Sequence, residues 1–164
     1  MSDLVIHALP VAGGILAIAP LPGGGGNYAA DLAHMREWRP ALVISLTPRV
    51  EMVAHGSEHL GQDMQERGAR WMHFPIPDLG IPETAVNTAW PEVSSFALKA
   101  LAGGGRVLVH CKAGCGRSGM VALRLMVEAG EQPDHALQRL RNLRPCAIET
   151  PEQMAWSLRR KGRV

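Results

Sequence analysis

Residues 110–118 bring a nucleophile, small residues and a cation together in one short segment, His-Cys-Lys-Ala-Gly-Cys-Gly-Arg-Ser. Residues 106–109, just before it, form an apolar run that is typical of a buried strand. Residues 118–129, just after it, predict a helix that Gly130 ends. We therefore expect this segment to form the turn between a strand and a helix, with Cys111 near its start.

A turn of this kind is suited to binding an anion. Successive backbone N–H groups at a helix N-terminus point at one place, and the helix dipole favours negative charge there. The same field favours the thiolate of Cys111, which is the nucleophilic form. The guanidinium of Arg117 presents a planar fork of donors that matches phosphate oxygens. These residue types at this spacing predict phosphoryl transfer through a phosphocysteine on Cys111.

Other residues of the loop are expected to hold the phosphate. Its equatorial oxygens, where charge spreads in the transition state, would be bound by Arg117 and by the backbone N–H groups of residues 112–117. The substrate-binding residues expected on this basis are Lys112, Ala113, Gly114, Cys115, Gly116 and Arg117. Gly114 and Gly116 would allow a positive φ, which turns the backbone toward the anion. His110, behind the nucleophile, is expected to orient the loop.

Proton transfer requires further groups. The hydroxyl of Ser118 can donate a hydrogen bond to the sulfur of Cys111 and help it leave in a second step. A leaving alkoxide or phenoxide needs a proton, so a carboxylic acid must approach from another loop. Asp78 is the strongest candidate, because it lies in an apolar, proline-containing loop after a predicted strand, and Asp63 and Glu83 are the alternatives.

The elements around the loop predict an α/β protein. Strands are expected at residues 3–8, 15–19, 41–46, 71–74 and 106–110, and helices at 27–38, 57–67, 88–102, 118–129, 133–143 and 150–160, with a short helical piece after Thr47-Pro48. This alternation favours one domain over residues 1–164, with a central, mostly parallel twisted sheet and helices on both faces. The cysteine loop would join a strand to the central, buried helix, and the ligand would lie beyond the carboxyl end of that strand.

Composition excludes several other classes of protein. The 164 residues suit one domain, and a net charge of +2 is too small to indicate a nucleic-acid or membrane partner. No stretch is long enough to cross a bilayer, and no signal peptide is predicted. The three cysteines are an odd number without framework spacing, so we expect a cytoplasmic protein.

His-Cys-x5-Arg-Ser resembles the active-site loop of the cysteine-dependent protein phosphatases. The Pro-x-x-Asp loop, 33 residues upstream of the cysteine, resembles the general-acid loop of their dual-specificity branch. Residues 144–153 resemble the segment Arg-Pro-Gly-x-Ile-Glu-Thr that follows in many members. The likeness runs from about residue 14 to the C-terminus, and the chain looks most similar to the kinase-associated phosphatase type and its small bacterial relatives.

The resemblance implies a phosphoester monohydrolase that needs no metal or other cofactor. It would act on phosphotyrosine, and on phosphoserine and phosphothreonine, of a phosphorylated protein. Asp78 would be the acid of the first step and the base of the second. Gln153 would place the water, although a capping box at Thr150 explains this glutamine equally well. Phosphate or sulfate is expected to bind in the loop.

Three other functions compete with this one. His-Cys-Lys-Ala-Gly also resembles the loop of the lipid phosphatase tumour suppressor, which favours a phosphoinositide or another small phosphoester as substrate. That loop carries a second lysine where this chain has Cys115. An inactive phosphate-binding module would lack the cysteine, the arginine or the acid. A sulfurtransferase of the rhodanese type needs neither the acid nor the serine.

Two cysteines depart from the pattern of the resembled family. Cys146 stands where glycine is usual, and Cys115 where an aliphatic residue is common. We therefore consider the hypothesis that one of them forms a protective disulfide with Cys111 under oxidation.

Overall fold

A five-stranded sheet of order β1-β2-β5-β3-β4 forms the centre of the computed structural model, which describes residues 2–159. The strands are β1 (His7–Val11), β2 (Gly14–Ala19), β3 (Leu42–Ser45), β4 (Arg70–His73) and β5 (Arg106–His110). β1 pairs antiparallel with β2, whereas the β2–β5, β5–β3 and β3–β4 pairs are parallel. The prediction of a mostly parallel central sheet is confirmed.

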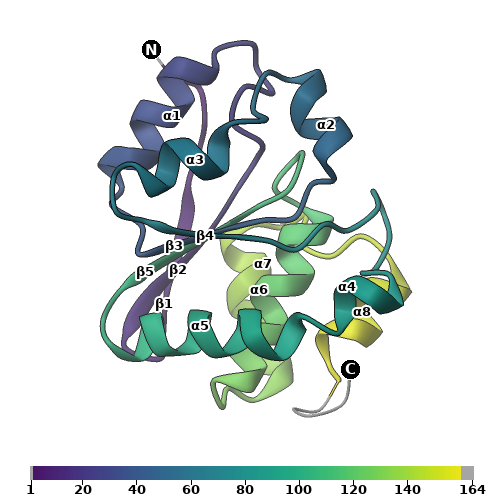
Figure 1. The fold of residues 1–164 in the computed structure, drawn as a ribbon. Helices are drawn as coiled ribbons and strands as arrows, with labels where there is room; N and C mark the ends of the chain where they lie inside the picture. The colour runs from purple at the N-terminus through teal and green to yellow at the C-terminus, as the bar shows by residue number, and fades with distance from the viewer. Residues whose placement is uncertain (1, 160–164) are drawn as a thin grey trace.

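Helices cover both faces of this sheet, as predicted. They are α1 (Tyr28–Glu37), α2 (Arg49–Ala54), α3 (Leu60–Gln65), α4 (Thr84–Asn87), α5 (Trp90–Ala102), α6 (Gly116–Glu128), α7 (Pro133–Leu143) and α8 (Pro151–Ser157). Figure 1 shows α1, α2 and α3 on one side of the sheet and the remaining helices on the other. Each side encloses its own cluster of buried apolar side chains. None of the helices described is long and apolar enough to span a membrane.

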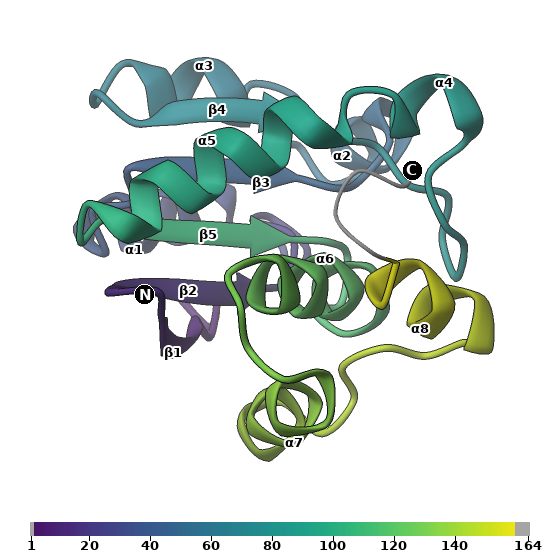
Figure 2. The ribbon, with the colours of Figure 1, turned by 90° about the horizontal axis from the view of Figure 1, so that it is seen from below.

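The helix after the cysteine loop is the central one. Every residue of α6 from Gly116 to Met126 is buried. Figure 2 shows α6 between α5 and α7, and α6 packs against β2 and β5. Over most of its length α6 has no exposed face. This explains why apolar residues occur on nearly all sides of the helix.

Local signals explain where several helices begin. The side chain of Asn27 accepts a hydrogen bond from the N–H of Ala30 and caps α1. Thr150 accepts the N–H of Gln153 at the start of α8. Thr47, in contrast, does not cap α2, because its buried hydroxyl has no hydrogen-bond partner among the described residues.

The first strand differs most from its predicted position. The sequence pattern placed it at residues 3–8, whereas β1 occupies His7–Val11. Ala12 and Gly13 both have positive φ, so they form a two-residue hairpin turn that fixes the register of β1 on β2. Pro10 is tolerated because β1 is an edge strand, and the carbonyl of Pro10 accepts a hydrogen bond from Arg139 of α7.

The remaining differences lie in helix lengths. The helix predicted at residues 57–67 is formed only over α3, and α4 was not predicted. α6 begins two residues earlier than expected, at Gly116. α8 ends at Ser157, and position 160 of its predicted end lies outside the described residues.

Candidate active site

The cysteine loop lies where the sequence predicts it, beyond the carboxyl end of β5. β5 ends at His110 and α6 begins at Gly116, so residues 111–115 form the connection. Gly114 has a φ of 72°, and a Cβ there would lie 2.9 Å from the backbone of Ala19 and Pro20. Gly116 does not have the positive φ expected for it. A Cβ there would come so close to the side-chain oxygens of residues 149 and 153 that these side chains would have to shift.

Cys111 and Ser118 lie together at the floor of this loop. The Sγ of Cys111 is 3.1 Å from the Oγ of Ser118, and the two side chains come from opposite ends of the loop. Cys111 is a free thiol that is 2% exposed, and Ser118 is fully buried. This geometry allows the hydroxyl to donate a hydrogen bond to a thiolate, as the sequence analysis expects.

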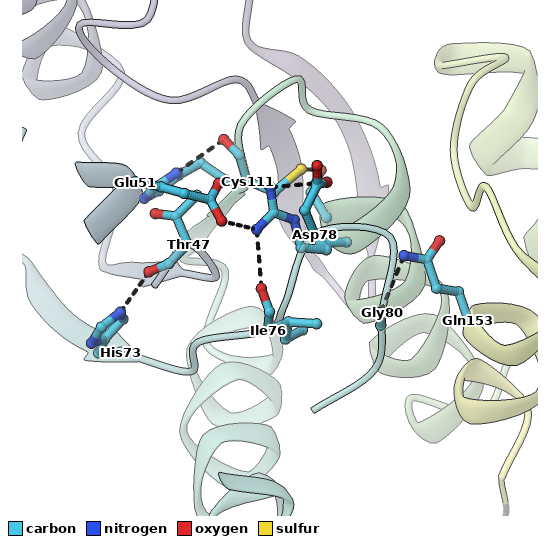
Figure 3. Close-up of polar contacts among 11 residues, drawn as sticks. Thr47, Glu51, His73, Ile76, Asp78, Gly80, Cys111 and Gln153 are labelled. Atoms are coloured by element: carbon cyan, nitrogen blue, oxygen red, sulfur yellow. Dashed lines mark hydrogen bonds and ion pairs between the residues drawn. The ribbon is translucent and has the colours of Figure 1, made fainter. Parts of the chain in front are cut away.

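Arg117 is held by two carboxylates, one from α2 and one from the loop between β4 and α4 (Figure 3). Its Nη1 and Nη2 each lie 2.9 Å from a carboxylate oxygen of Glu51, in a bidentate pair. Nη1 also donates to the carbonyl of Ile76 at 3.0 Å, and Nη2 lies 3.4 Å from Oδ1 of Asp78. Burial alone would lower the pKa of Arg117, but the hydrogen bond and charge of Glu51, with the charges of Cys111 and Asp78, raise it above its ordinary value. The guanidinium is therefore fixed and fully charged beside the nucleophile.

Only one of the three candidate acids has a contact with the cysteine loop. Asp78, on the loop between β4 and α4, reaches Arg117 and keeps 66% of its side chain exposed. Asp63 instead accepts a hydrogen bond from Tyr28 at 2.5 Å, between α3 and α1. Glu83 is the exposed residue that precedes α4. Asp78 is thus the candidate acid that the fold brings into contact with Arg117.

His110 has hydrogen bonds that fix its tautomer. Its Nδ1 faces the carbonyl of Cys111 at 3.3 Å, and its Nε2 lies 2.6 Å from the Oγ of Ser45. A carbonyl only accepts, so Nδ1 must carry the proton. The indole N–H of Trp71 donates to the same Oγ at 2.8 Å, which leaves the hydroxyl proton of Ser45 for Nε2.

The charge state of His110 agrees with this arrangement. Complete burial is the main reason why the pKa of His110 falls to about 4, and the nearby charges of His73 and Arg117 lower it further. The hydrogen bond to the carbonyl of Cys111 opposes this shift only in part. A neutral, fixed ring fits the expectation that His110 orients the loop.

Gln153 ties the last helix to the loop of the candidate acid. Its Nε2 donates to the carbonyl of Gly80 at 3.2 Å, as Figure 3 shows. Its Oε1 accepts the N–H of Glu149 at 2.9 Å, and its own N–H is capped by Thr150. Both the nitrogen and the oxygen of the Gln153 side-chain amide therefore have hydrogen-bond partners. The capping role that the sequence allows at Thr150 is also present.

The sequence analysis missed Glu51 and Ser45. Ser45 ends β3, and Glu51 lies in the first turn of α2 just after it. Both reach the site because β3 is the neighbour of β5 in the sheet, which places its carboxyl end beside the cysteine loop. The sequence does show an acidic residue, Glu51, shortly after a predicted strand. Assigning it to the site requires knowing that this strand lies beside β5 in the sheet.

The hypothesis of a disulfide to Cys111 is wrong. Cys115 is bonded to Cys146, with the two Cα atoms 5.1 Å apart, so both proposed partners of Cys111 are occupied by each other. The expectation of a cytoplasmic protein rested on cysteines without a pairing pattern, and this bond removes that support.

Comparisons with known proteins agree with this geometry. A family model described as dual specificity phosphatase, catalytic domain, matches residues 28–161. Cyclin-dependent kinase inhibitor 3 of Rattus norvegicus is 34% identical over 130 residues, which cover 77% of this chain and 60% of the relative. The chain thus spans less than two thirds of the length of that relative.

Solved structures share the fold. A crystal structure of kinase associated phosphatase, with its catalytic-site cysteine replaced by serine, has a TM-score of 0.81 at 23% identity and covers 96% of this chain and 94% of its own. Tk-PTP in its active form has a TM-score of 0.69 at 28% identity, with 86% and 87% covered. With its sequence match, its fold and its cysteine loop in agreement, the chain belongs to the family of dual-specificity phosphatase catalytic domains.

Proposed function

We propose that the chain is a phosphoester monohydrolase that dephosphorylates phosphotyrosine, and also phosphoserine and phosphothreonine, in proteins. The observation that carries this proposal is the position of the Cys111 sulfur, 3.1 Å from the hydroxyl of Ser118 and next to an arginine that also contacts Asp78. A nucleophile, a fixed cation and a proton donor from another loop are the parts that phosphoryl transfer through cysteine requires.

The first step transfers the phosphoryl group to the protein. The N–H groups of residues 112–117 and the guanidinium of Arg117 bind the three non-bridging oxygens. The thiolate of Cys111 attacks phosphorus, the S–P bond forms and the bond to the leaving oxygen breaks. Asp78 gives its proton to that oxygen, so the product leaves as a neutral alcohol or phenol.

The second step returns the free protein. Asp78, now a carboxylate, takes a proton from water while the water oxygen attacks phosphorus. The S–P bond breaks, and Ser118 stabilises the departing thiolate of Cys111 by donating a hydrogen bond. Glu51 acts only through Arg117, whose two Nη atoms it holds, and Gln153 acts through the carbonyl of Gly80, so both are positioning residues.

The choice of protein substrates rests on the charge of the loop. A multiply phosphorylated sugar ring favours several cations around the cup. Lys112 is the one lysine of the loop, and Cys115, at the place of the second lysine, is used in a disulfide. This composition supports a phosphorylated protein over a phosphoinositide.

Hydrolysis of a small aryl phosphate tests the proposal. We expect Cys111→Ser to abolish turnover and Asp78→Ala to lower kcat by about a hundredfold, as for a lost general acid. Asp63→Ala is the matched control, because this carboxylate contacts Tyr28 instead of Arg117, and it should retain the wild-type rate. Turnover by Cys111→Ser, or loss of turnover on addition of a chelator, would refute the mechanism.

Substrate class is tested separately. Phosphopeptides carrying phosphotyrosine, phosphoserine or phosphothreonine are compared with short-chain phosphoinositides by release of inorganic phosphate. We expect a higher kcat/KM on the phosphopeptides. A clear preference for the phosphoinositides would assign the chain to the alternative, lipid-directed function.

A further inference from the structure

One short segment after α7 grips three consecutive residues of the phosphate loop. Arg144 donates from Nη2 to the carbonyl of Ala113 at 3.0 Å and from Nε to the carbonyl of Gly114 at 3.1 Å. The next loop residue, Cys115, is joined to Cys146 by the disulfide. The carbonyl of Cys115 also accepts the N–H of Ile148 at 3.3 Å.

These contacts determine where the loop's N–H groups point. In a planar trans peptide, the C=O of one residue and the N–H of the next point in opposite directions. When Arg144 holds the carbonyls of residues 113 and 114 on the outside of the loop, the N–H groups of residues 114 and 115 are turned to the inside. The carbonyl of Cys115 is held both by the N–H of Ile148 and, at 2.9 Å, by the N–H of Gly119 within α6, so α6 and this segment together orient the N–H of Gly116. The segment at residues 144–148 therefore orients two of the donors that would bind phosphate and contributes to the orientation of a third.

The disulfide is the covalent part of this grip, and it is open to chemistry. Cys115 and Cys146 are both partly exposed, whereas the free Cys111 is buried at the floor of the loop. A reductant in solution therefore reaches the bridge more readily than a buried site. The bridge lies two residues from Arg144 and two from Ile148, so its loss would remove the one covalent tie between this segment and the loop and leave hydrogen bonds to hold it.

We propose that Cys146 is a positioning residue for the phosphate loop, and that its bond to Cys115 places phosphate binding under redox control. This rests on the proposed function only in taking phosphate as the ligand of the loop. Reduction by a dithiol breaks the S–S bond, forms two protein thiols and converts the reductant to its own disulfide. Without the covalent bond, hydrogen bonds alone hold the segment against the loop, so the loop carbonyls are held outward less firmly. The anion must then order more of the N–H groups itself, and affinity falls.

The test uses Cys111→Ser, which removes the one cysteine outside the bridge, so that any response to a reductant comes from the bond between Cys115 and Cys146. Binding of inorganic phosphate is measured by calorimetry at 25 °C before and after treatment with dithiothreitol, and mass spectrometry determines the state of residues 115 and 146. We expect Kd to rise about three- to tenfold on reduction, as donors lose their preorganisation. With Cys146→Ser added, Kd should match the reduced value and should not respond to dithiothreitol.

Several outcomes would overturn the inference. One is an unchanged Kd in protein whose two thiols are shown to be free, even if the unfolding temperature falls, because a purely structural bond behaves in that way. Another is the absence of the bond between residues 115 and 146 from air-equilibrated protein. If Cys146→Ser fails to fold, reduction of the parent protein still decides the matter.

The same experiment separates this inference from the proposed function. Phosphate binding is measured without turnover. A protein that binds phosphate in a redox-dependent way but hydrolyses no phosphoester would refute the proposed function alone. A protein that hydrolyses phosphoesters but binds phosphate equally in both redox states would refute only the redox inference.

Discussion

The buried histidine behind the nucleophile should make the protein lose stability in mild acid. Because of its burial, the pKa of His110 is about 4 in the folded protein, against 6.5 for an unperturbed histidine. Between these values the unfolded chain binds a proton at this residue and the folded chain does not. The free energy of unfolding therefore rises with pH across this window. The stabilisation that comes from keeping His110 neutral is complete above pH 6.5 and is lost as pH falls toward 4.

The size of the effect follows from the shift. One pKa unit is worth about 1.4 kcal/mol, so the difference corresponds to about 3 kcal/mol in the free energy of unfolding. Of this, about 1 kcal/mol should be lost between pH 7.5 and 5.5, and most of the rest by about pH 4.5. A loss of this size is a substantial part of the 5–15 kcal/mol that typically stabilises a domain.

Urea unfolding of wild type and His110→Gln across this pH range measures the effect. Glutamine keeps a donor for the carbonyl of Cys111 and an acceptor for Ser45, but it does not titrate. We expect the variant's free energy of unfolding to fall by about 2 kcal/mol less than that of wild type between pH 7.5 and 4.5. His135→Gln, on the exposed side of α7, is the control and should follow wild type. Parallel curves for wild type and His110→Gln would refute the reasoning.

Three further predictions concern the loop and its supports. Gly119→Ala should lower the free energy of unfolding, measured in urea, by about 1–3 kcal/mol, because a Cβ would lie 2.7 Å from the backbone of Ile148. Gly25→Ala is the control, because the space around Gly25 is open, and it should leave the free energy of unfolding unchanged. Glu51→Gln should reduce kcat/KM on an aryl phosphate by about tenfold or more, because Arg117 loses its charged bidentate partner, and a wild-type value would contradict this. Ser118→Ala should slow the second step, so that a burst of phenol precedes slow turnover, and steady turnover without a burst would contradict the role assigned to this hydroxyl.

Groups that are contiguous in the sequence could be predicted from it, and groups that meet across the sheet could not. Cys111, Arg117 and Ser118 belong to one strand, turn and helix, so local pattern alone places them together. Asp78 required one more assumption, that the loop after a neighbouring strand faces the same edge of the sheet. That assumption holds, because β4 and β5 are both parallel neighbours of β3.

Glu51 and the disulfide show where local pattern is insufficient. Glu51 is 66 residues from the arginine that it binds, and only the adjacency of β3 and β5 brings the two together. Cys115 and Cys146 are separated by 31 residues, and their pairing depends on how α7 returns the chain to the loop. The helix positions followed from apolar periodicity and caps, whereas the turn at Ala12 required a positive φ that its residue type does not suggest.

The hairpin at the start of the chain has a consequence for association between molecules. Because Val11 and Gly14 flank the two-residue turn, alternation along β1 directs the backbone of Pro10 away from β2, toward the open side of the sheet. Proline offers no donor there, and Arg139 already occupies its carbonyl. A strand from another molecule would thus find neither a donor nor a free acceptor at this position, which makes this part of the β1 edge a poor template for pairing between molecules.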